Sequence, residues 1–482
     1  MAKQVIDLSM KVSTNAPVFY GATGLWGLAH QFVMTNDTYE ATGILRTYGR
    51  IKELYRTCLI SMSDHASTHI DAVYHINAHG DTIDRMPLGT LCGEAVILDH
   101  TDKKPIEYDP LKPAGERIIS GDWVTVESLQ QAAKKVGGIK EGDIVFIRTD
   151  AYKKIPSWEY CHRMVPLRIE ALKWLLNQGI RVIGVDQPSI DIAPDYLYPH
   201  HYLREANFFH FENLANLDKI PLSRFRLVCY PLKWEGGSGS PVRALAVIGD
   251  GKENKSDGKL YDLSYMIPEK PIRQSWTKQW RSTIVSWHDI HYTRLQETKQ
   301  LFFSDHVQTH VDAPANFNPK GKCIDEIPPE SFLERDVVLI DLSHKKPGEF
   351  ITKQDLAGVE IRPDDVPIIY TGISKMFTQM EKPFTGFPPY SDYIVPLSVE
   401  AVEYLVKEKG IKMFGIDEDE IDTDQNLWPA HNLQKKYEFC IIENLKLFPA
   451  VLELPKRFKI SVIPLSIDGG TASPVRAVAI VK

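Results

Sequence analysis

Residues 63–72 read SDHASTHIDA, and residues 304–313 read SDHVQTHVDA. The second stretch lies 241 positions after the first, half the length of the 482-residue chain. A match of this kind at such a distance indicates an internal duplication, which predicts the number of domains before any secondary structure is assigned.

Further pairs of matching segments follow in the same order along the chain. The offset between the copies drifts slowly, as insertions and deletions in loops would make it drift. The sequence therefore predicts two homologous domains. The further pairs are GVD at 184–186 with GID at 415–417, ENL at 212–214 with ENL at 443–445, and GGSGSPVRA at 236–244 with GGTASPVRA at 469–477.

A polar run, DGKENKSDGK at residues 250–259, separates the two copies. It contains too few apolar residues to bury a core of its own, as is typical of a linker. We therefore place one domain at 1–249 and the second at 260–482, with 250–259 as the linker.

Composition excludes several classes of protein. Hydrophobic residues make up 43% and charged residues 25%, as in ordinary globular proteins. The net charge of −7 offers no overall attraction to nucleic acid or to an anionic membrane. The chain shows no leader-like apolar segment and no run of about 18 apolar residues, so we expect a cytoplasmic protein. Its six cysteines are scattered singly, which favours neither a zinc ribbon nor a disulfide framework.

Short β-branched runs alternate with helical patterns within each copy. One helix is predicted behind Thr125 as N-cap and ends at Gly137; another begins at Pro166 and ends at Gly179, and 396–410 repeats the second. Strands mixed with helices predict an α/β fold, although the strand order cannot be read from this pattern. The predicted strands lie at 94–99, 143–149, 180–185, 225–230 and 242–248.

The duplicated stretch contains His65, His69 and Asp71, residue types that bind zinc, manganese or iron. On a helix, Asp71 would lie about 200° around from His69 at ~100° per residue. On a strand, the two histidines would be about 13 Å apart, whereas metal bonds are only ~2 Å long. The backbone must therefore bend at 66–68, which leaves His69 and Asp71 on one face of an extended segment.

A second pair of candidate ligands recurs at a spacing of 12 residues, His200 with Glu212 and His431 with Glu443. A single histidine is more often a hydrogen-bonded structural residue, but the repetition of the whole set favours metal binding over shared structural polarity. His201 competes with His200 as a ligand in the first copy. The candidate set comprises His65, His69, Asp71, His200 and Glu212 in the first copy and His306, His310, Asp312, His431 and Glu443 in the second.

This arrangement resembles the pattern HxGTHxDxPxHF of the metal-dependent cyclase-like hydrolases, which include bacterial kynurenine formamidase, isatin hydrolase and trans-dienelactone hydrolase. The resemblance covers both copies nearly end to end, from DLS at 7–9 and at 262–264 to the SPVRA endings. It implies two swivelling β/β/α (cyclase-like) domains in tandem. It also implies one or two divalent ions per site, zinc or manganese, bound by the candidate ligands above.

The same resemblance assigns His75 as the general acid/base that works with a metal-bound water. The second copy has Asn316 at that place, and an amide has no titrating group near neutral pH. We therefore expect the second site to bind metal but to be catalytically impaired. The family's glycine is Ser67 in the first copy and Gln308 in the second, so both are strained if the bend requires positive φ.

The expected function is hydrolysis of an amide, cyclic amide or lactone bond in a small molecule, with a C–N bond favoured over C–O. The alternative is a non-catalytic metal- or ligand-binding protein derived from the same family, and His75 favours the enzyme. Because family members commonly dimerise, the tandem copies are expected to form an intramolecular pseudo-dimer, which can associate further.

Other polar residues have open interpretations. Arg243 and Arg476 either orient an acidic substrate or pair with a carboxylate. Trp26 either stacks against a substrate ring or anchors its loop. The histidines without counterparts in the second copy are expected to serve packing or to lie on the surface; they are His79, His100, His162 and His210.

Overall fold

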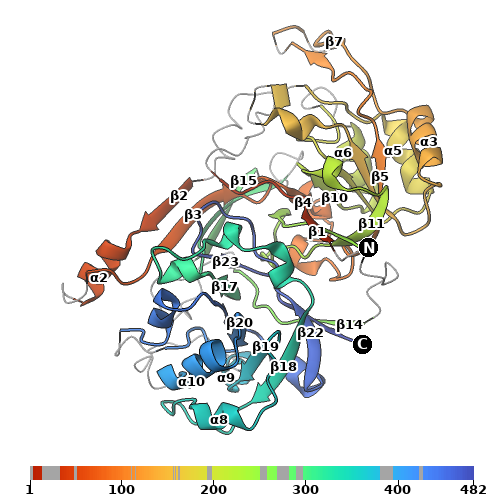
Figure 1. Cartoon of the computed structure of the whole chain (residues 1–482). Coiled ribbons are helices and arrows are strands. Elements are labelled where there is room, and N and C mark those ends of the chain that lie inside the picture. Colours follow the sequence, from red (N-terminus) through yellow and green to blue (C-terminus); the bar gives the residue numbers. More distant parts are fainter. Residues whose placement is uncertain are drawn as a thin grey trace. The chain divides into compact units, whose positions relative to one another are not determined.

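The computed structural model contains two compact units, which are described separately below (Figure 1). The first unit comprises Met1–Val33, Ser61–Ser256 and Ile284–Leu301, and the second comprises Met34–Ile60, Asp257–Thr283 and Phe302–Lys482. The structure describes residues 4–13, 33–47, 52–109, 111–113, 115–155, 157, 159–160, 163–192, 198–249, 258–268, 282–288, 297–379, 394–422 and 427–482.

Each unit thus contains a segment from the other half of the sequence. Residues 284–301 belong to the first unit, and residues 34–60 belong to the second. The units are therefore not two contiguous stretches of chain. Most of the predicted linker lies outside the described residues, so its boundaries stay a prediction.

The first unit is built on a nine-stranded sheet with the order β1-β13-β11-β5-β8-β9-β10-β4-β12. The middle strands β5, β8, β9 and β10 run parallel, and antiparallel strands flank them on both sides. In sheet order the strands are Gln4–Asp7, Leu245–Ile248, Arg224–Val228, Gly93–Asp99, Ile144–Arg148, Val182–Val185, His210–Glu212, His69–Asp71 and Gly239–Pro241.

The second unit contains a nine-stranded sheet of the same topology, β14-β24-β22-β18-β19-β20-β21-β17-β23. Every strand occupies the place of its counterpart in the first sheet, which confirms the α/β class and the two homologous domains. In sheet order the strands are Lys259–Asp262, Val478–Val481, Arg457–Ser461, Arg335–Asp341, Val366–Tyr370, Met413–Ile416, Cys440–Glu443, His310–Asp312 and Ala472–Pro474.

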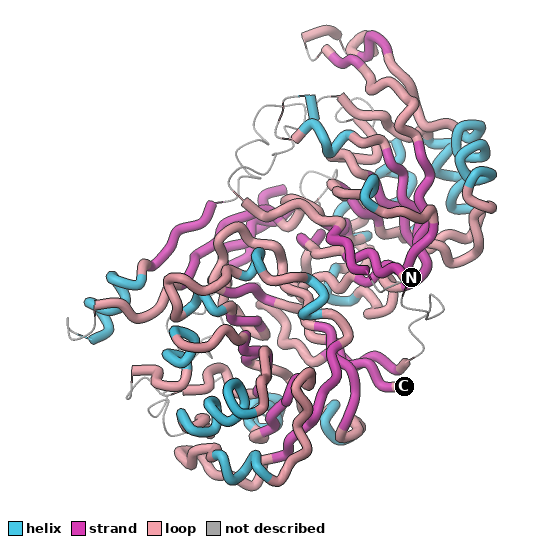
Figure 2. Tube along the Cα trace, in the orientation of Figure 1, coloured by secondary structure: helices cyan, strands magenta, loops and turns pink. Residues whose placement is uncertain are grey.

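The parallel centre of each sheet is apolar on both faces. The residues of β8 from Ile144 to Ile147 are all buried, as are those of β19. Strands buried on both faces read as continuous hydrophobic runs rather than as alternating patterns. Helices pack on this centre (Figures 1 and 2): α3 Val126–Lys135, α5 Ile169–Asn177 and α6 Tyr198–Ala206 in the first unit, and α8 Lys353–Ala357 and α10 Val399–Glu403 in the second. A further helix of the second unit is α9 Ile373–Gln379.

The predicted helices are present, with differences at their starts. Thr125 caps α3 by accepting a hydrogen bond from the Ser128 amide, as expected for its N-cap. The second helix, α5, begins at Ile169 rather than at Pro166, because Leu167 instead forms a parallel bridge with Val124. In the second unit, α10 continues as a π-helix at Tyr404–Glu408.

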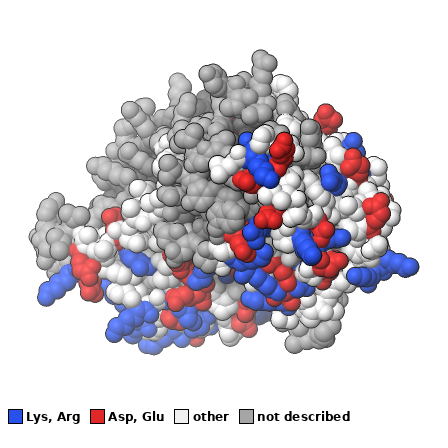
Figure 3. All heavy atoms as spheres, turned by 90° about the horizontal axis from the view of Figure 1, so that it is seen from above, with Lys and Arg blue, Asp and Glu red and all other residues white. Residues whose placement is uncertain are grey.

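Shorter elements complete the described structure. A four-stranded sheet has the order β15-β16-β3-β2, and β6 pairs with β7. On the face drawn in Figure 3, acidic and basic residues are interspersed among the described residues. Among the helices the structure describes, none has the length and apolar character needed to cross a bilayer. The bounds are β15 Ser282–His288, β16 Thr298–Ser304, β3 Thr57–Ser63, β2 Val33–Asp37, β6 Glu107–Tyr108, β7 Ile118–Ser120 and α2 Tyr39–Thr47.

Candidate metal centres

A backbone bend brings the first candidate ligands together. Ser67 adopts a left-handed conformation with φ of 57°, and its hydroxyl donates to the Met10 carbonyl over 3.1 Å. The chain then extends as β4, so that His69 and Asp71 point to the same face. The bend lies where the ligand spacing predicted it. In the second unit Gln308 has φ of 53° at the same place.

The neighbouring strand β10 supplies Glu212. In its antiparallel pairing with β4, Glu212 lies opposite His69, and His210 lies opposite Asp71. The Nε2 atom of His69 is 3.2 Å from Asp71 Oδ1 and 3.5 Å from Glu212 Oε2. Pairing between strands therefore joins residues that are 139 and 143 positions apart in the sequence.

His200 comes from helix α6 and is fixed by Asp191. The Asp191 carboxylate accepts hydrogen bonds from the His200 backbone amide at 3.1 Å and from its Nδ1 at 2.7 Å. The opposite ring nitrogen, Nε2, lies 3.6 Å from Glu212 Oε1 and 3.9 Å from Asp71 Oδ2. Four of the five residues predicted as ligands of the first site thus lie together and are buried: His69, Asp71, His200 and Glu212.

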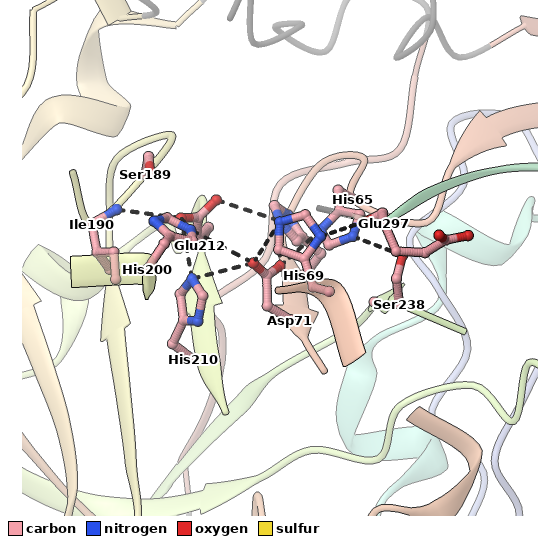
Figure 4. A network of polar contacts seen from close by, with 12 residues as sticks. His65, His69, Asp71, Ser189, Ile190, His200, His210, Glu212, Ser238 and Glu297 are labelled. Carbon is pink, nitrogen blue, oxygen red and sulfur yellow. Dashed lines mark hydrogen bonds and ion pairs between the residues drawn. The ribbon is translucent and has the colours of Figure 1, made fainter. Parts of the chain in front are cut away.

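Asp71 lies between two groups of side chains (Figure 4). Its Oδ1 faces His65 Nδ1 at 2.8 Å, and its Oδ2 faces His210 Nε2 at 3.2 Å. The potential ligand atoms form two sets, and within each set all atoms lie within 4.8 Å of one another. Asp71 belongs to both sets. The sets are His65 with Asp71 and His75, and Asp71 with His200, His210 and Glu212.

The second unit repeats this arrangement around Asp312. His310 Nε2 lies 3.1 Å from Asp312 Oδ1 and 3.4 Å from Glu443 Oε2. His431 Nε2 lies 3.3 Å from Glu443 Oε1, and its Nδ1 contacts Asp422 at 2.9 Å. The two sets here are His306 with His310 and Asp312, and Asp312 with His431 and Glu443. All five residues predicted for the second site are therefore clustered as well.

The orientation of the rings fits metal ligands. His69 Nδ1 lies 2.9 Å from the Ser67 carbonyl, and His310 Nδ1 lies 2.8 Å from the Gln308 carbonyl. Because a carbonyl only accepts, Nδ1 carries a hydrogen and Nε2 points at the carboxylates. Metal-binding histidines are held in this way by carbonyl or carboxylate partners.

The buried carboxylates stabilise the protonated form of a neighbouring histidine in both centres. Burial opposes the charged form of His69, but hydrogen bonds with Asp71 and Glu212 outweigh it and raise its pKa to about 10. Burial is likewise outweighed at His310, whose pKa is raised to about 10. Oδ1 of Asp312 is the buried acceptor here, with His306 Nδ1 at 2.8 Å and His310 Nε2 at 3.1 Å. Carboxylates that attract protons in this way also suit a divalent cation, so the residues fit one.

The two centres differ at the position predicted for acid/base chemistry. His75, at the end of the 3₁₀ turn Val73–His75, has its Nδ1 2.5 Å from the Glu297 carbonyl. Burial, and next the charge of His65, lower the pKa of His75 to about 3. In the second unit the Asn316 amide donates to the Arg56 carbonyl over 2.9 Å. Asn316 therefore keeps the hydrogen bond of His75 without its titrating ring.

A pocket of about 300 Å³, a volume that includes its open mouth, adjoins the second centre. Tyr55 lies beside Phe317 and Trp428, with ring centroids 5.6 Å and 5.4 Å apart. Trp428 Nε1 donates to Glu420 at 2.7 Å. The lining residues are Tyr55, Thr57, His306, Asp312, Asn316, Phe317, Glu420, Trp428, His431 and Glu443.

Sequence reasoning missed some residues of the centres. His210, interpreted as packing, lies in the first cluster, and its place opposite Asp71 in the sheet was not visible without the strand order. Asp191 and Asp422, which hold the ligand histidines, recur at a spacing of 231 and could have been found through the repeat.

The remaining polar candidates have ordinary partners or lie elsewhere. Arg243 pairs with Asp7 at 2.7 Å, and Arg476 pairs with Asp262 at 3.0 Å. His100 contacts the Leu98 carbonyl at 3.3 Å, consistent with packing. Trp26 and His162 lie outside the described residues. His79 and His201 belong to neither set of potential ligands in the described part of the first unit.

Comparison with known proteins finds relatives that match part of this chain. Kynurenine formamidase of Salinibacter ruber is 28% identical over 187 residues, which are 39% of this chain and 77% of that protein. Kynurenine formamidase of Bacillus cytotoxicus is 29% identical over 191 residues, with the same coverage. The structure of isatin hydrolase A from Labrenzia aggregata bound to benzyl benzoate shows 26% identity and a TM-score of 0.43, and the match covers 51% of this chain and 94% of that one.

The family described as "Putative cyclase" matches this chain twice, at residues 6–192 and at residues 261–423. Together the two matches cover well over half of the 482 residues, and each falls on one of the repeated copies. The chain therefore belongs to the cyclase family and contains that family's domain as a tandem duplication.

Proposed function

We propose that this chain is a metal-dependent hydrolase that cleaves an amide, cyclic amide or lactone bond of a small molecule, with turnover in the first centre. The observation that carries the proposal is the contact of the His75 ring with a buried cluster of histidines and carboxylates: its Nε2 lies 3.7 Å from Asp71 Oδ2. The kinship with kynurenine formamidases supports a C–N bond over a C–O bond.

The ligands proposed for the first centre are His65, His69, Asp71, His200 and Glu212. A divalent ion bound by them, zinc or manganese, would lower the pKa of a water molecule to near 7 and polarise the carbonyl of the substrate. Burial keeps these side chains out of bulk water: both Asp71 and His69 are 2% exposed. Burial of charged groups strengthens the electrostatic stabilisation of a developing oxyanion.

His75 is proposed to move the proton. Because Glu297 offers only a carbonyl to Nδ1, the ring carries its hydrogen on Nδ1, and Nε2 is free to accept a proton from the attacking water. The imidazolium formed in this way then donates its proton to the leaving nitrogen or oxygen. The new bond joins the water oxygen to the acyl carbon as the bond to the leaving atom breaks.

In the second centre we propose metal binding without efficient turnover. Asn316 is 3% exposed, and its amide is 3.1 Å from His306 Nε2. An amide can orient a neighbouring ring but cannot exchange a proton near neutral pH. This observation favours, for the second half, the alternative of a metal- or ligand-binding domain.

The first test is metal removal from the full-length chain. A chelator should abolish hydrolysis of a panel containing an N-formyl aromatic amine, a cyclic amide and a lactone. Zinc or manganese should restore it, with one or two ions per site measured by elemental analysis. Stoichiometric metal without turnover on the panel would favour the non-catalytic alternative.

A pair of substitutions tests the assignment of His75. His75→Ala should lower kcat/KM by ~10²–10⁴, the usual contribution of a general acid/base. Asn316→Ala is the matched change in the second centre. It should leave kcat/KM within about twofold of the wild-type value, because Asn316 takes no part in proton transfer. The reverse pattern, with activity lost only in Asn316→Ala, contradicts the assignment.

We also propose that the two halves act as an intramolecular pseudo-dimer in the cytoplasm. The contacts of His75 with Glu297 support this, because the Glu297 amide also donates to the His75 carbonyl over 2.7 Å and belongs to the second half of the sequence. Residues 1–250 expressed alone should be inactive, and co-expression of 260–482 should restore activity. Full activity of a stable monomeric 1–250 fragment contradicts the proposal.

A further inference from the structure

His210, on strand β10, is a buried residue of the first centre that has no equivalent in the second. It lies on β10, between β9 and β4 in the nine-stranded sheet, directly opposite Asp71, and is 1% exposed. The corresponding position of β21, 231 residues later, is Ile441, which lies opposite Asp312. The repeat thus holds an imidazole beside one centre and an alkyl side chain beside the other.

The distances around His210 suit direct coordination of an ion. Its Nε2 lies 3.2 Å from Asp71 Oδ2 and 3.3 Å from Glu212 Oε1. Zinc bonds to nitrogen and oxygen are ~2.0–2.2 Å long, so two ligand atoms of a tetrahedral ion are about 3.3–3.6 Å apart. In Figure 4 the His210 ring points between the two carboxylates.

His200 completes the arrangement. Its ring centroid lies 4.9 Å from that of His210, and its Nε2 is 3.6 Å from the same Glu212 oxygen that His210 contacts. One ligand atom from each of the four residues lies within 4.8 Å of every other. The corresponding set in the second unit has three members, because Ile441 offers no ligand atom.

We infer that His210 is a fourth protein ligand, which closes the ion position formed by Asp71, His200 and Glu212 in the first centre, whereas the equivalent position of the second centre stays open. Zinc positions with four protein ligands are structural, and those with three keep a place for water or substrate. The first centre would then hold a tightly bound ion on this side of Asp71. The other side of Asp71, which faces His65 and His75, would then remain open for substrate to bind and leave.

A weaker role for His210 makes a different prediction. Its Nε2 could merely donate a hydrogen bond to Glu212, the contact seen at 3.3 Å. Partners that act through a ligand in this way typically contribute 10–100-fold to metal affinity, and a glutamine can replace their N–H group. Loss of a direct ligand should exceed about 100-fold, and glutamine should not restore it.

The experiment uses the full-length chain, stripped of metal and titrated with Co²⁺. Release of the ions to a chelator and the visible absorption spectrum are recorded for wild type, His210→Ile and His210→Gln. Each substitution changes one centre, so the other serves as an internal reference. We expect His210→Ile and His210→Gln both to weaken one class of cobalt site by more than about 100-fold and to lose its four-coordinate absorption.

The reciprocal variant Ile441→His places the ring in the second centre. It should slow cobalt release there and add four-coordinate absorption, which keeps the inference testable if His210→Ile folds poorly. Wild-type behaviour of His210→Gln, or unchanged binding in both His210→Ile and Ile441→His, overturns it. The inference rests on the proposed metal dependence: a wild-type chain that binds no cobalt overturns both, whereas equal binding by wild type and variants overturns only the role of His210.

Discussion

The two centres share a scaffold but differ in the groups that can do chemistry. In both centres, a backbone carbonyl from a residue that is not a ligand accepts a hydrogen bond from the side chain at the acid/base position. The carbonyl belongs to Glu297 for His75 and to Arg56 for Asn316. The hydrogen bond is kept although the proton-transfer group is lost. Geometry and reactivity are therefore separable in this fold, and Asn316 preserves the first without the second.

The largest expected difference between the halves concerns Asp71 and Asp312, the carboxylates that belong to both ligand sets of their centre. Asp71→Asn removes the negative charge that faces five imidazoles of the first centre, so kcat/KM should fall by more than about 100-fold, beyond what partners of ligands usually contribute. Asp312→Asn should remove metal from the second centre and leave kcat/KM within about twofold. Steady-state kinetics with metal analysis of each variant measures both effects.

Equal losses of activity in Asp71→Asn and Asp312→Asn would contradict the proposed division of labour. Retained metal in both variants would instead show that these carboxylates are not ligands. A circular dichroism spectrum matching that of wild type serves as the control for folding, since both aspartates are buried.

A smaller effect, on stability, should be similar in the two halves. A Cβ atom on Gly184 would lie 2.7 Å from Phe146 Cδ1, and one on Gly415 would lie 2.7 Å from Ile368 Cδ1. Overpacking of this kind costs about 1–3 kcal/mol, so Gly184→Ala and Gly415→Ala should both lower the free energy of unfolding. Denaturant titrations measure the change, and a loss confined to one variant would contradict equivalent packing of the two sheets.

Much of this organisation could be predicted from the chain itself, because the duplication constrains both copies at once. The repeated histidines and carboxylates identified both clusters, and metal-bond lengths placed the bend within residues 66–68, where Ser67 has the positive φ. The start of α5 was predicted three residues too early. Proline at 166 suits a first helical turn, but the bridge of Leu167 with Val124 decides the boundary, and such tertiary pairing is not visible locally.

The sequence could not predict His210 as part of a centre for a related reason. Its neighbour Asp71 lies 139 positions earlier, and the antiparallel pairing of β4 with β10 brings the two together. The exchange of residues 284–301 and 34–60 between the units is equally non-local. Periodicity describes one segment at a time, whereas these features depend on which segments meet.

The smallest effect that sharpens the comparison concerns the two bends. A non-glycine residue in the left-handed region costs roughly 1–2 kcal/mol, so Gln308→Gly should relieve strain and, after the greater flexibility of the unfolded chain is counted, stabilise the second unit by about 0.5 kcal/mol. Ser67→Gly should be close to neutral, because it also removes the hydroxyl that donates to the Met10 carbonyl, a bond that contributes about 1 kcal/mol. Denaturation midpoints compare the variants, and a clear gain in Ser67→Gly would show that this hydrogen bond does not support the bend.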